Sequence, residues 1–180
     1  MINKKIDLKK IINKKYNLII IEGIDKSGKS TLADKLLKSI KNSVHIKANI
    51  RPYNNTKEES QKIKEYYESI LELLNNKFFK DKTLIVDRFY PSQLVYSIKR
   101  GNDNFNDKWY EEFENKIIKF NHLLIYCYIS DNILHKRFLR DKEEYLKIKD
   151  IKLILNRYNY FVTITKLNKI LINTLDMDNK

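Results

Sequence analysis

The stretch Leu18-Ile19-Ile20-Ile21-Glu22-Gly23-Ile24-Asp25-Lys26-Ser27-Gly28-Lys29-Ser30 decides the fold of this chain of 180 residues. Its apolar start is typical of a buried strand, and Gly23 to Ser30 matches the pattern G-x-x-x-x-G-K-[ST] without a mismatch. Residues 31–40 then carry leucines and an isoleucine at helical spacing. Strand, glycine-marked loop and helix are the context that this phosphate-binding loop (P-loop) requires, so a chance match explains the stretch poorly.

The loop has the chemistry to hold a nucleoside triphosphate. Its glycines let backbone N–H groups fold around the phosphates, which also meet the positive end of the following helix. We expect Lys29 to reach the β and γ phosphates and Ser30 to ligate Mg²⁺. Binding of ATP or GTP is thus the firmest prediction, with a cofactor site formed by Gly23, Asp25, Lys26, Ser27, Gly28, Lys29, Ser30 and Thr31.

Apolar segments alternate with helical patterns along the rest of the chain. Besides the strand at 18–21 and the helix at 31–40, the patterns predict strands at 44–48, 83–86, 123–129 and 169–173, and helices at 57–76, 91–99, 109–120, 132–140 and 145–166. Continuous apolar strands between helices indicate a parallel sheet covered on both faces. We therefore expect an α/β fold, a three-layer α/β/α sandwich with a central parallel sheet, preceded by a helix-prone extension at 1–16.

Composition restricts the partners and the compartment. Hydrophobic residues make up 42% of the chain, which is too much for a disordered protein. The net charge of +13 raises nucleic acid as a partner, but lysine, asparagine and isoleucine are abundant throughout, as A+T-rich coding would produce. Because diffuse lysines without a recognisable module usually form a solvated surface, we do not expect nucleic acid to bind.

Cys127, the single cysteine, lies in an apolar run, which predicts a buried, inert thiol and fits a reducing compartment. No run approaches the roughly 18 apolar residues that cross a bilayer, and the lysine-rich start lacks the apolar core of a secretory signal. We therefore expect a cytoplasmic protein that does not associate with membranes.

A second motif follows the strand at 83–86 and reads Asp87-Arg88-Phe89-Tyr90-Pro91-Ser92-Gln93-Leu94-Val95-Tyr96. It puts a carboxylate and a guanidinium at the carboxyl end of a strand, where open α/β sheets bind ligands. The base-reading motif N-K-x-D of switch GTPases is absent from the sequence. Hydrolytic ATPases commonly end this strand in an acidic pair, whereas here an arginine follows the aspartate.

With both motifs in place, the sequence resembles the thymidylate kinase family, whose members carry E-G-x-D-x-x-G-K-[ST] and D-R-[YFH]-x-x-S-x-x-A-Y. Residues 22–30 match the first pattern and residues 87–96 resemble the second. Looser matches are Arg51-Pro52 with Thr56, and the segment 129–140, which leads into an arginine-bearing lid expected around 137–148. The resemblance implies one nucleoside monophosphate kinase domain at 17–180, a homodimer, and Mg²⁺-dependent transfer of the γ-phosphate of ATP to dTMP.

The resemblance also implies roles for single residues. Arg51 and Arg88 would hold the acceptor phosphate, a task that suits the forked, always charged guanidinium. Asp25 would hold the acceptor sugar hydroxyl, Gln93 would pair with the thymine edge, and Tyr96 would exclude a ribose 2'-hydroxyl. The implied catalytic residues are Asp25, Lys29, Arg88, Arg137 and Arg140; the substrate-binding ones Arg51, Arg88, Ser92, Gln93, Tyr96 and Tyr66; and the metal-binding ones Ser30, Asp25 and Asp87.

Each role has a plainer alternative, since Asp25 could simply shape the loop, the lid arginines could be solvated, and Tyr96 could belong to the core. The sequence also departs from the family in the helix at 57–76, which lacks the usual phenylalanine and arginine that contact the base. Tyr66 or Tyr67 could stack on the base instead, although both also fit a helical core stripe. The preferred base therefore stays open, with dUMP or a broader set of deoxynucleotides as alternatives to dTMP.

Three other functions remain open at this stage. A deoxynucleoside kinase has a similar fold but needs a carboxylate base beside a sugar hydroxyl, and Glu22 is the candidate. A basic nucleic-acid-binding ATPase would show turnover that nucleic acid stimulates and salt weakens. A catalytically silent nucleotide-binding protein would bind ATP without acceptor-dependent release of ADP.

Overall fold

The computed structural model describes residues 8–48, 50, 56–100, 105–140 and 146–177. A five-stranded sheet forms its centre, with the strands in the order β2-β3-β1-β4-β5 and every neighbouring pair parallel. The strands are β1 (Leu18–Glu22), β2 (Ser43–Lys47), β3 (Thr83–Asp87), β4 (His122–Tyr128) and β5 (Lys169–Asn173). All five carboxyl ends therefore meet at one edge of the sheet.

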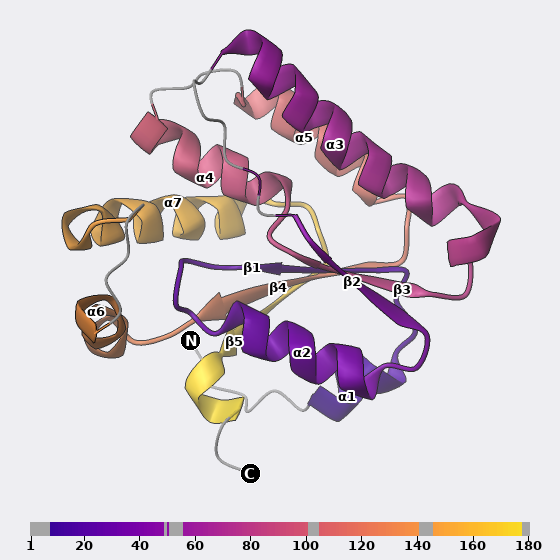
Figure 1. Cartoon of the computed structure of the whole chain (residues 1–180), viewed down its shortest axis with the longest axis horizontal. Coiled ribbons are helices and arrows are strands. Elements are labelled where there is room, and N and C mark those ends of the chain that lie inside the picture. Colours follow the sequence, from indigo (N-terminus) through magenta and orange to yellow (C-terminus); the bar gives the residue numbers. More distant parts are fainter. Residues whose placement is uncertain (1–7, 49, 51–55, 101–104, 141–145, 178–180) are drawn as a thin grey trace.

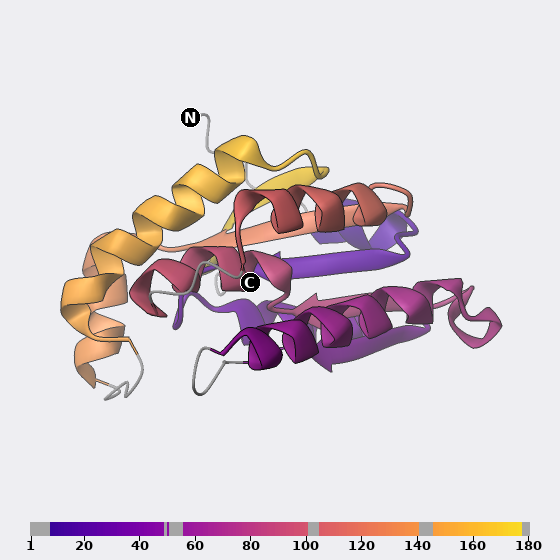
Figure 2. The same ribbon diagram turned by 90° about the horizontal axis from the view of Figure 1, so that it is seen from above.

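Helices cover both faces of the sheet and confirm the predicted three-layer α/β/α sandwich (Figure 1). Helices α1 and α2 lie on one face, and α3, α4, α5 and α7 cover the other, while α6 lies beside the carboxyl edge (Figures 1 and 2). Their bounds are α1 Leu8–Asn13, α2 Lys29–Ser39, α3 Lys57–Asn75, α4 Tyr90–Arg100, α5 Asp107–Ile117, α6 Asp131–Arg140 and α7 Ile151–Ile164. Short 3₁₀ turns occupy Lys77–Phe79, Ile148–Asp150 and Thr174–Met177.

Two apolar cores lie on the two faces of the sheet. Alternate residues of β1 enter different cores: Leu18 and Ile20 pack towards α3, α4, α5 and α7, and Ile19 and Ile21 pack towards α2. Every residue of β1 and β3 is buried, which is why these strands read as continuous apolar runs rather than alternating ones.

The predicted elements are all present, and the differences lie at their ends. Helix α5 begins at Asp107, two residues earlier than predicted, because the side chain of Asn106 caps it by accepting from the N–H of Trp109 at 3.0 Å. The helix predicted at 145–166 was wrong at its start, since α7 begins only at Ile151, after a 3₁₀ turn that the carboxylate of Asp150 supports by accepting from the N–H of Lys147.

The predicted N-terminal extension contributes to the core. Ile11 of α1 and Tyr16 are both buried against the face of the sheet that α2 covers. The carbonyl oxygen of Tyr16 also accepts a 2.7 Å hydrogen bond from the hydroxyl of Thr83, at the start of β3. Residues 8–16 are thus attached to the sheet, and the boundary between residues 16 and 17 stays a prediction.

None of the helices in the described ranges combines the length and the apolar composition that crossing a bilayer requires.

Candidate functional site

A pocket of about 460 Å³ lies at the carboxyl edge of the sheet, where the P-loop, the ends of β2 and β3, and helix α6 converge. It brings together most of the residues that the motifs predicted for phosphate binding. The lining residues are Asp25, Lys26, Gly28, Lys29, Ser30, Thr31, Lys47, Asp87, Arg88, Arg137 and Arg140. Six of these side chains are basic and two are acidic, so the pocket suits a polyanion.

The two glycines of the P-loop occupy positions where a side chain would not fit. Gly23 has φ of 147°, and a Cβ there would overlap the carbonyl oxygen of Cys127 on β4. Gly28 has φ of 87°, and a Cβ there would lie 2.9 Å from the Cβ of Thr174. The loop therefore keeps its shape by packing tightly against β4 and the segment after β5.

Lys29, the first residue of α2, is buried, and its side chain reaches back to the P-loop backbone. Its ammonium group donates a 2.7 Å hydrogen bond to the carbonyl oxygen of Ile24. Burial, together with the positive charge of Arg88, lowers the pKa of Lys29 to about 8, although Asp25 and Asp87 act in the opposite direction. An anionic ligand would supply the negative charge that this ammonium group needs.

Ser30 and Asp87 form the pair expected at a magnesium site. The hydroxyl of Ser30 donates to Oδ2 of Asp87 at 3.0 Å. The other carboxylate oxygen, Oδ1, is buried and has no hydrogen-bond partner among the described residues. A hydroxyl and a carboxylate are the oxygen donors that Mg²⁺ accepts beside phosphates and waters, so the pair fits this ion. Within the described ranges no group of three or more His, Cys, Asp or Glu side chains forms a denser metal site.

Arg88 follows β3 and reaches across the edge of the sheet to the P-loop. Its guanidinium forms a buried ion pair with Oδ1 of Asp25, and Oδ2 of Asp25 accepts from the hydroxyl of Tyr96 at 3.1 Å. The second terminal nitrogen of Arg88, Nη1, lies 3.2 Å from the hydroxyl of Ser92 and 3.4 Å from that of Tyr158. The side chains of Arg88 and Asp25 are only 7% and 15% exposed, so protein contacts hold both in place.

Glu22 lies behind this ion pair and is completely buried. One carboxylate oxygen accepts from the backbone N–H of Phe89 at 2.7 Å, and the other accepts from the hydroxyls of Ser92 and Tyr158 at 2.9 and 3.0 Å. Burial raises the pKa of Glu22, although Arg88 and these hydrogen bonds act against it. Glu22 therefore supports the Asp-Arg turn, where Arg88 has a φ of 65°, and is not among the residues that line the pocket.

The residues predicted to contact the base lie outside the described lining of this pocket. The side-chain amide of Gln93 donates to the carbonyl oxygen of Ile50 at 2.7 Å and to the hydroxyl of Tyr67 at 2.9 Å. Tyr67 is fully buried and Tyr66 only partly, and their ring centroids lie 5.9 Å apart. Of the two tyrosines, Tyr67 is thus the one that joins the core.

Arg137 and Arg140 come from α6 and also line the pocket. The guanidinium of Arg137 donates to the carbonyl oxygen of Lys26 at 2.8 Å, which ties α6 to the P-loop. Arg51, predicted for the acceptor phosphate, and residues 141–145 of the predicted lid lie outside the described residues.

Sequence reasoning missed three residues of this region: Lys47, Tyr158 and Thr174. Lys47 lines the pocket from the end of β2, and its position at the carboxyl end of a predicted strand was an available signal. Thr174 donates its hydroxyl to the carbonyl oxygen of Ser27 at 2.7 Å and so fastens the P-loop. Tyr158 belongs to the apolar stripe of α7, where a sequence pattern predicts only core.

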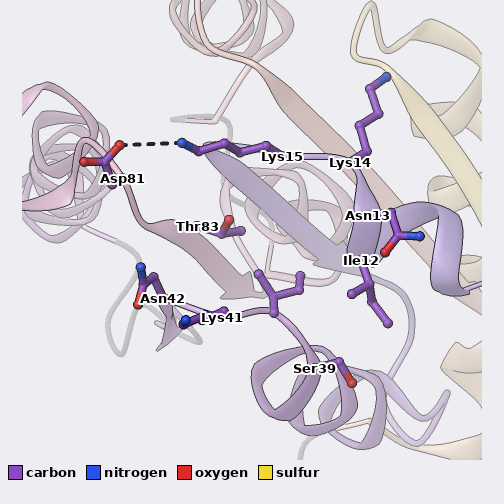
Figure 3. Close-up of a pocket in the computed structure, with 10 residues that line it drawn as sticks. Ile12, Asn13, Lys14, Lys15, Ser39, Lys41, Asn42, Asp81 and Thr83 are labelled. Carbon is purple, nitrogen blue, oxygen red and sulfur yellow. Dashed lines mark ion pairs between the residues drawn. The ribbon is translucent and has the colours of Figure 1, made fainter.

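A second pocket, of about 560 Å³, lies near the opposite edge of the sheet, between the end of α1, the end of α2 and the start of β3 (Figure 3). It also contains basic residues, Lys14, Lys15 and Lys41, of which Lys15 pairs with Asp81 at 3.5 Å. None of the motif residues lines it.

The fold and the sequence both have known relatives. No protein-family model matches the chain. Solved structures of the thymidylate kinases of Candida albicans and Ehrlichia chaffeensis superpose with TM-scores of 0.63 and 0.54, at 15% and 14% identity. These superpositions cover 89% of this chain in both cases, and 84% and 94% of the respective kinases, which establishes the fold of P-loop nucleotide kinases.

The crystal structure of Bacillus subtilis YorR, in complex with phosphorylated GDP, superposes with a TM-score of 0.68 at 26% identity over 89% of this chain and 92% of YorR. In sequence, the SPbeta prophage-derived YorR protein of Bacillus subtilis strain 168 is 31% identical over 141 residues, which are 78% of this chain and 79% of YorR. The chain therefore belongs to the family of YorR, within the fold of the P-loop nucleotide kinases.

Proposed function

We propose that the protein is an ATP- and Mg²⁺-dependent nucleoside monophosphate kinase of the thymidylate kinase type, and that dTMP is its leading acceptor. The observation that carries the proposal is the arrangement of two sets of charged and hydroxyl groups in and beside one pocket. Lys29, Ser30 and Asp87 form the first set, and the Asp25–Arg88 ion pair with Tyr96 forms the second. The first set suits a donor triphosphate, and the second suits an acceptor that carries both a phosphate and a sugar.

In this proposal the chain catalyses the transfer mainly by positioning and by neutralising charge. Lys29 leaves the carbonyl oxygen of Ile24 and binds the donor phosphates, while Arg88 orients the acceptor phosphate. Arg137 and Arg140 close over the donor from α6 and spread the charge that develops on the transferred group. Ser30 and Asp87, with Asp25 nearby, would hold Mg²⁺, which would supply positive charge against the negative charge of the donor phosphates.

No general base is required, because the phosphate of a monophosphate acceptor is already an anion near neutral pH. A deoxynucleoside kinase would need a carboxylate base at a sugar hydroxyl, and Glu22 was the candidate. Three protein donors already satisfy the two carboxylate oxygens of Glu22, and it is fully buried, which disfavours that alternative.

The acceptor base needs a direct test, because the YorR relative was crystallised with phosphorylated GDP, a purine nucleotide. The experiment measures ADP release from ATP and Mg²⁺, with each common nucleoside, ribonucleoside monophosphate and deoxynucleoside monophosphate supplied separately. Release with dTMP, or with dTMP and dUMP, supports the proposal. A preference for dGMP would keep a monophosphate kinase but change its base.

The same assay separates the other functions. Turnover with thymidine but not with dTMP would indicate a nucleoside kinase, and release that only DNA or RNA stimulates would indicate a nucleic-acid-dependent ATPase. Binding of ATP without acceptor-dependent release would indicate a silent nucleotide-binding protein. We also expect a cytoplasmic homodimer, as in thymidylate kinases, and light scattering of the purified chain tests its oligomeric state.

A further inference from the structure

Lys47 is the one basic residue in the described lining of the pocket to which the sequence analysis gave no role. It is the last residue of β2, and its register partner on the parallel neighbour β3 is Asp87. Partners in register place their side chains on the same face of the sheet. Asp87 uses that face to contact Ser30 at the start of α2, so Lys47 lies on the same face as the predicted magnesium site.

The order of the strands places Lys47 on the acceptor side of the pocket. The P-loop follows β1, and α6 with its arginines follows β4, so the donor triphosphate belongs over the β1–β4 half of the sheet. Strands β3 and β2 continue away from that half, and β3 leads to Arg88. Lys47, at the end of β2, therefore lies one strand farther from β1 than Arg88 does, on the side away from β4.

Lys47 also differs from the other basic side chains in its surroundings. Lys29 contacts Ile24, Arg88 is paired with Asp25, and Arg137 is bound to Lys26. Lys47 is exposed, and its ammonium group forms no hydrogen bond or ion pair with any described residue. An exposed cation on a long side chain can turn towards an incoming phosphate without breaking a contact to a described residue.

We propose that the ammonium group of Lys47 binds the phosphate of the acceptor nucleotide and neutralises the charge that builds up during transfer. This inference rests on the proposed function and adds a specific phosphate ligand to it, from a strand that neither motif reaches. It deepens the assignment of Arg88, because one guanidinium already engaged by Asp25, Ser92 and Tyr158 has few donors left for a phosphate.

The test compares Lys47→Met, Lys47→Arg and Lys41→Met. Lys41 is a suitable control, because it precedes β2, lies in the second pocket and loses the same charge when it is replaced (Figure 3). We expect Lys47→Met to lower kcat/KM for the acceptor by at least about tenfold, as the loss of a charged phosphate contact does. Lys47→Arg should restore most of the rate, Lys41→Met should match the wild type, and calorimetry should show unchanged binding of a non-hydrolysable ATP analogue by all three.

Several results would overturn the inference. Equal rates for Lys47→Met and Lys41→Met would mean that Lys47 touches no reacting group. Weaker binding of the ATP analogue to Lys47→Met, with an unchanged KM for the acceptor, would move Lys47 to the donor. Unchanged rates together with tighter binding of Mg²⁺ would mean that Lys47 only balances the charge of Asp87. Failure of the proposed function would be distinguishable, because the wild-type protein itself would then not transfer phosphate to any nucleoside monophosphate.

Discussion

The two pockets described above lie near opposite edges of the same sheet, both contain several basic residues, and the larger of the two is not the candidate site. The pocket at the carboxyl edge, about 460 Å³, is lined by residues whose backbone and side chains are tied to one another, such as Lys29 with Ile24 and Asp87 with Ser30. In the pocket of about 560 Å³, the ion pair found among the described lining residues is Lys15–Asp81, whose side chains are 74% and 81% exposed (Figure 3).

The difference teaches that neither the volume nor the positive charge of a pocket singles out the candidate phosphate site in this lysine-rich chain. The second pocket lies at the carboxyl ends of α1 and α2, where the partial charge of a helix is negative and lysines are favourable neighbours. The first pocket lies at the amino end of α2, where the helix itself attracts an anion. Basic residues near the carboxyl end of α2 are therefore explained by the helix dipole, whereas those near its amino end indicate an anion site.

The strongest contrast is expected from removing one lysine at each end of α2. Lys29→Met should reduce phosphate transfer by about 10²–10³-fold, because it removes a buried charge aimed at the phosphates. Lys41→Met should leave the rate unchanged. Steady-state assays with the acceptor identified by the ADP-release experiment measure both rates.

The stability of Lys29→Met should not fall together with its activity. Burial depresses the pKa of Lys29 to about 8, so its charged form is unfavourable in the folded protein near neutral pH. Thermal unfolding of Lys29→Met should therefore occur at the same temperature as in the wild type or higher. A Lys29→Met variant that is inactive because it has unfolded would contradict the assignment of Lys29 to phosphate binding.

The next effect concerns the buried ion pair. Asp25→Asn should destabilise the fold by about 3 kcal/mol, because it leaves the guanidinium of Arg88 buried without its carboxylate. Tyr96→Phe removes only a neutral donor to the same carboxylate and should cost about 1 kcal/mol. Urea unfolding at neutral pH gives both values, and equal stabilities for the two variants would show that the ion pair is not the main support.

A pH series tests the environment of Lys29. In the ligand-free protein its pKa is about 8, and bound phosphates raise that pKa, so ATP binding above pH 8 must take up a proton. Affinity for Mg·ATP should be constant below this pH and fall by up to about tenfold for each unit above it. Calorimetry in two buffers of different ionisation enthalpy measures the uptake, and Lys29→Met should abolish it.

Sequence patterns predicted the sheet, the three layers and the phosphate loop because each depends on local spacing. Apolar runs mark strands buried on both faces, and two of the chain's three glycines stand where a Cβ would collide with β4 or Thr174. The Asp-Arg motif was also recognisable, because it follows a predicted strand directly, at the carboxyl end where open α/β sheets bind ligands.

What the sequence did not predict are the contacts between distant segments. Tyr158 lies 70 positions after Arg88, and Thr174 lies 147 positions after Ser27, yet their hydroxyls support the turn and the loop. Both residues look like ordinary members of a helix stripe and a strand end. The predicted start of helix α7, at residue 145, was too early, because the helical sequence pattern continues through the 3₁₀ turn that Asp150 supports.

A smaller effect tests the attachment of the P-loop to the end of β5. Thr174→Val keeps the shape of the side chain but removes the hydroxyl that donates to the carbonyl oxygen of Ser27 at 2.7 Å. The loss of this buried hydrogen bond should cost about 1 kcal/mol of stability and weaken ATP binding slightly. Thr174→Ser should restore both, and a valine variant as stable as the wild type would show that packing against Gly28 alone holds the loop.

The smallest effect is expected at the second pocket, where the ion pair of Lys15 and Asp81 is the counterpart of Asp25–Arg88. Both side chains are mostly exposed, so water screens their attraction and holding two long side chains together costs entropy. Lys15→Met and Asp81→Asn, alone or combined, should leave the unfolding midpoint in urea and the rate of phosphate transfer unchanged. A measurable coupling between the two substitutions, or a loss of activity in either, would show that this pocket communicates with the candidate site through α2. The distinction between the two edges of the sheet would then fail.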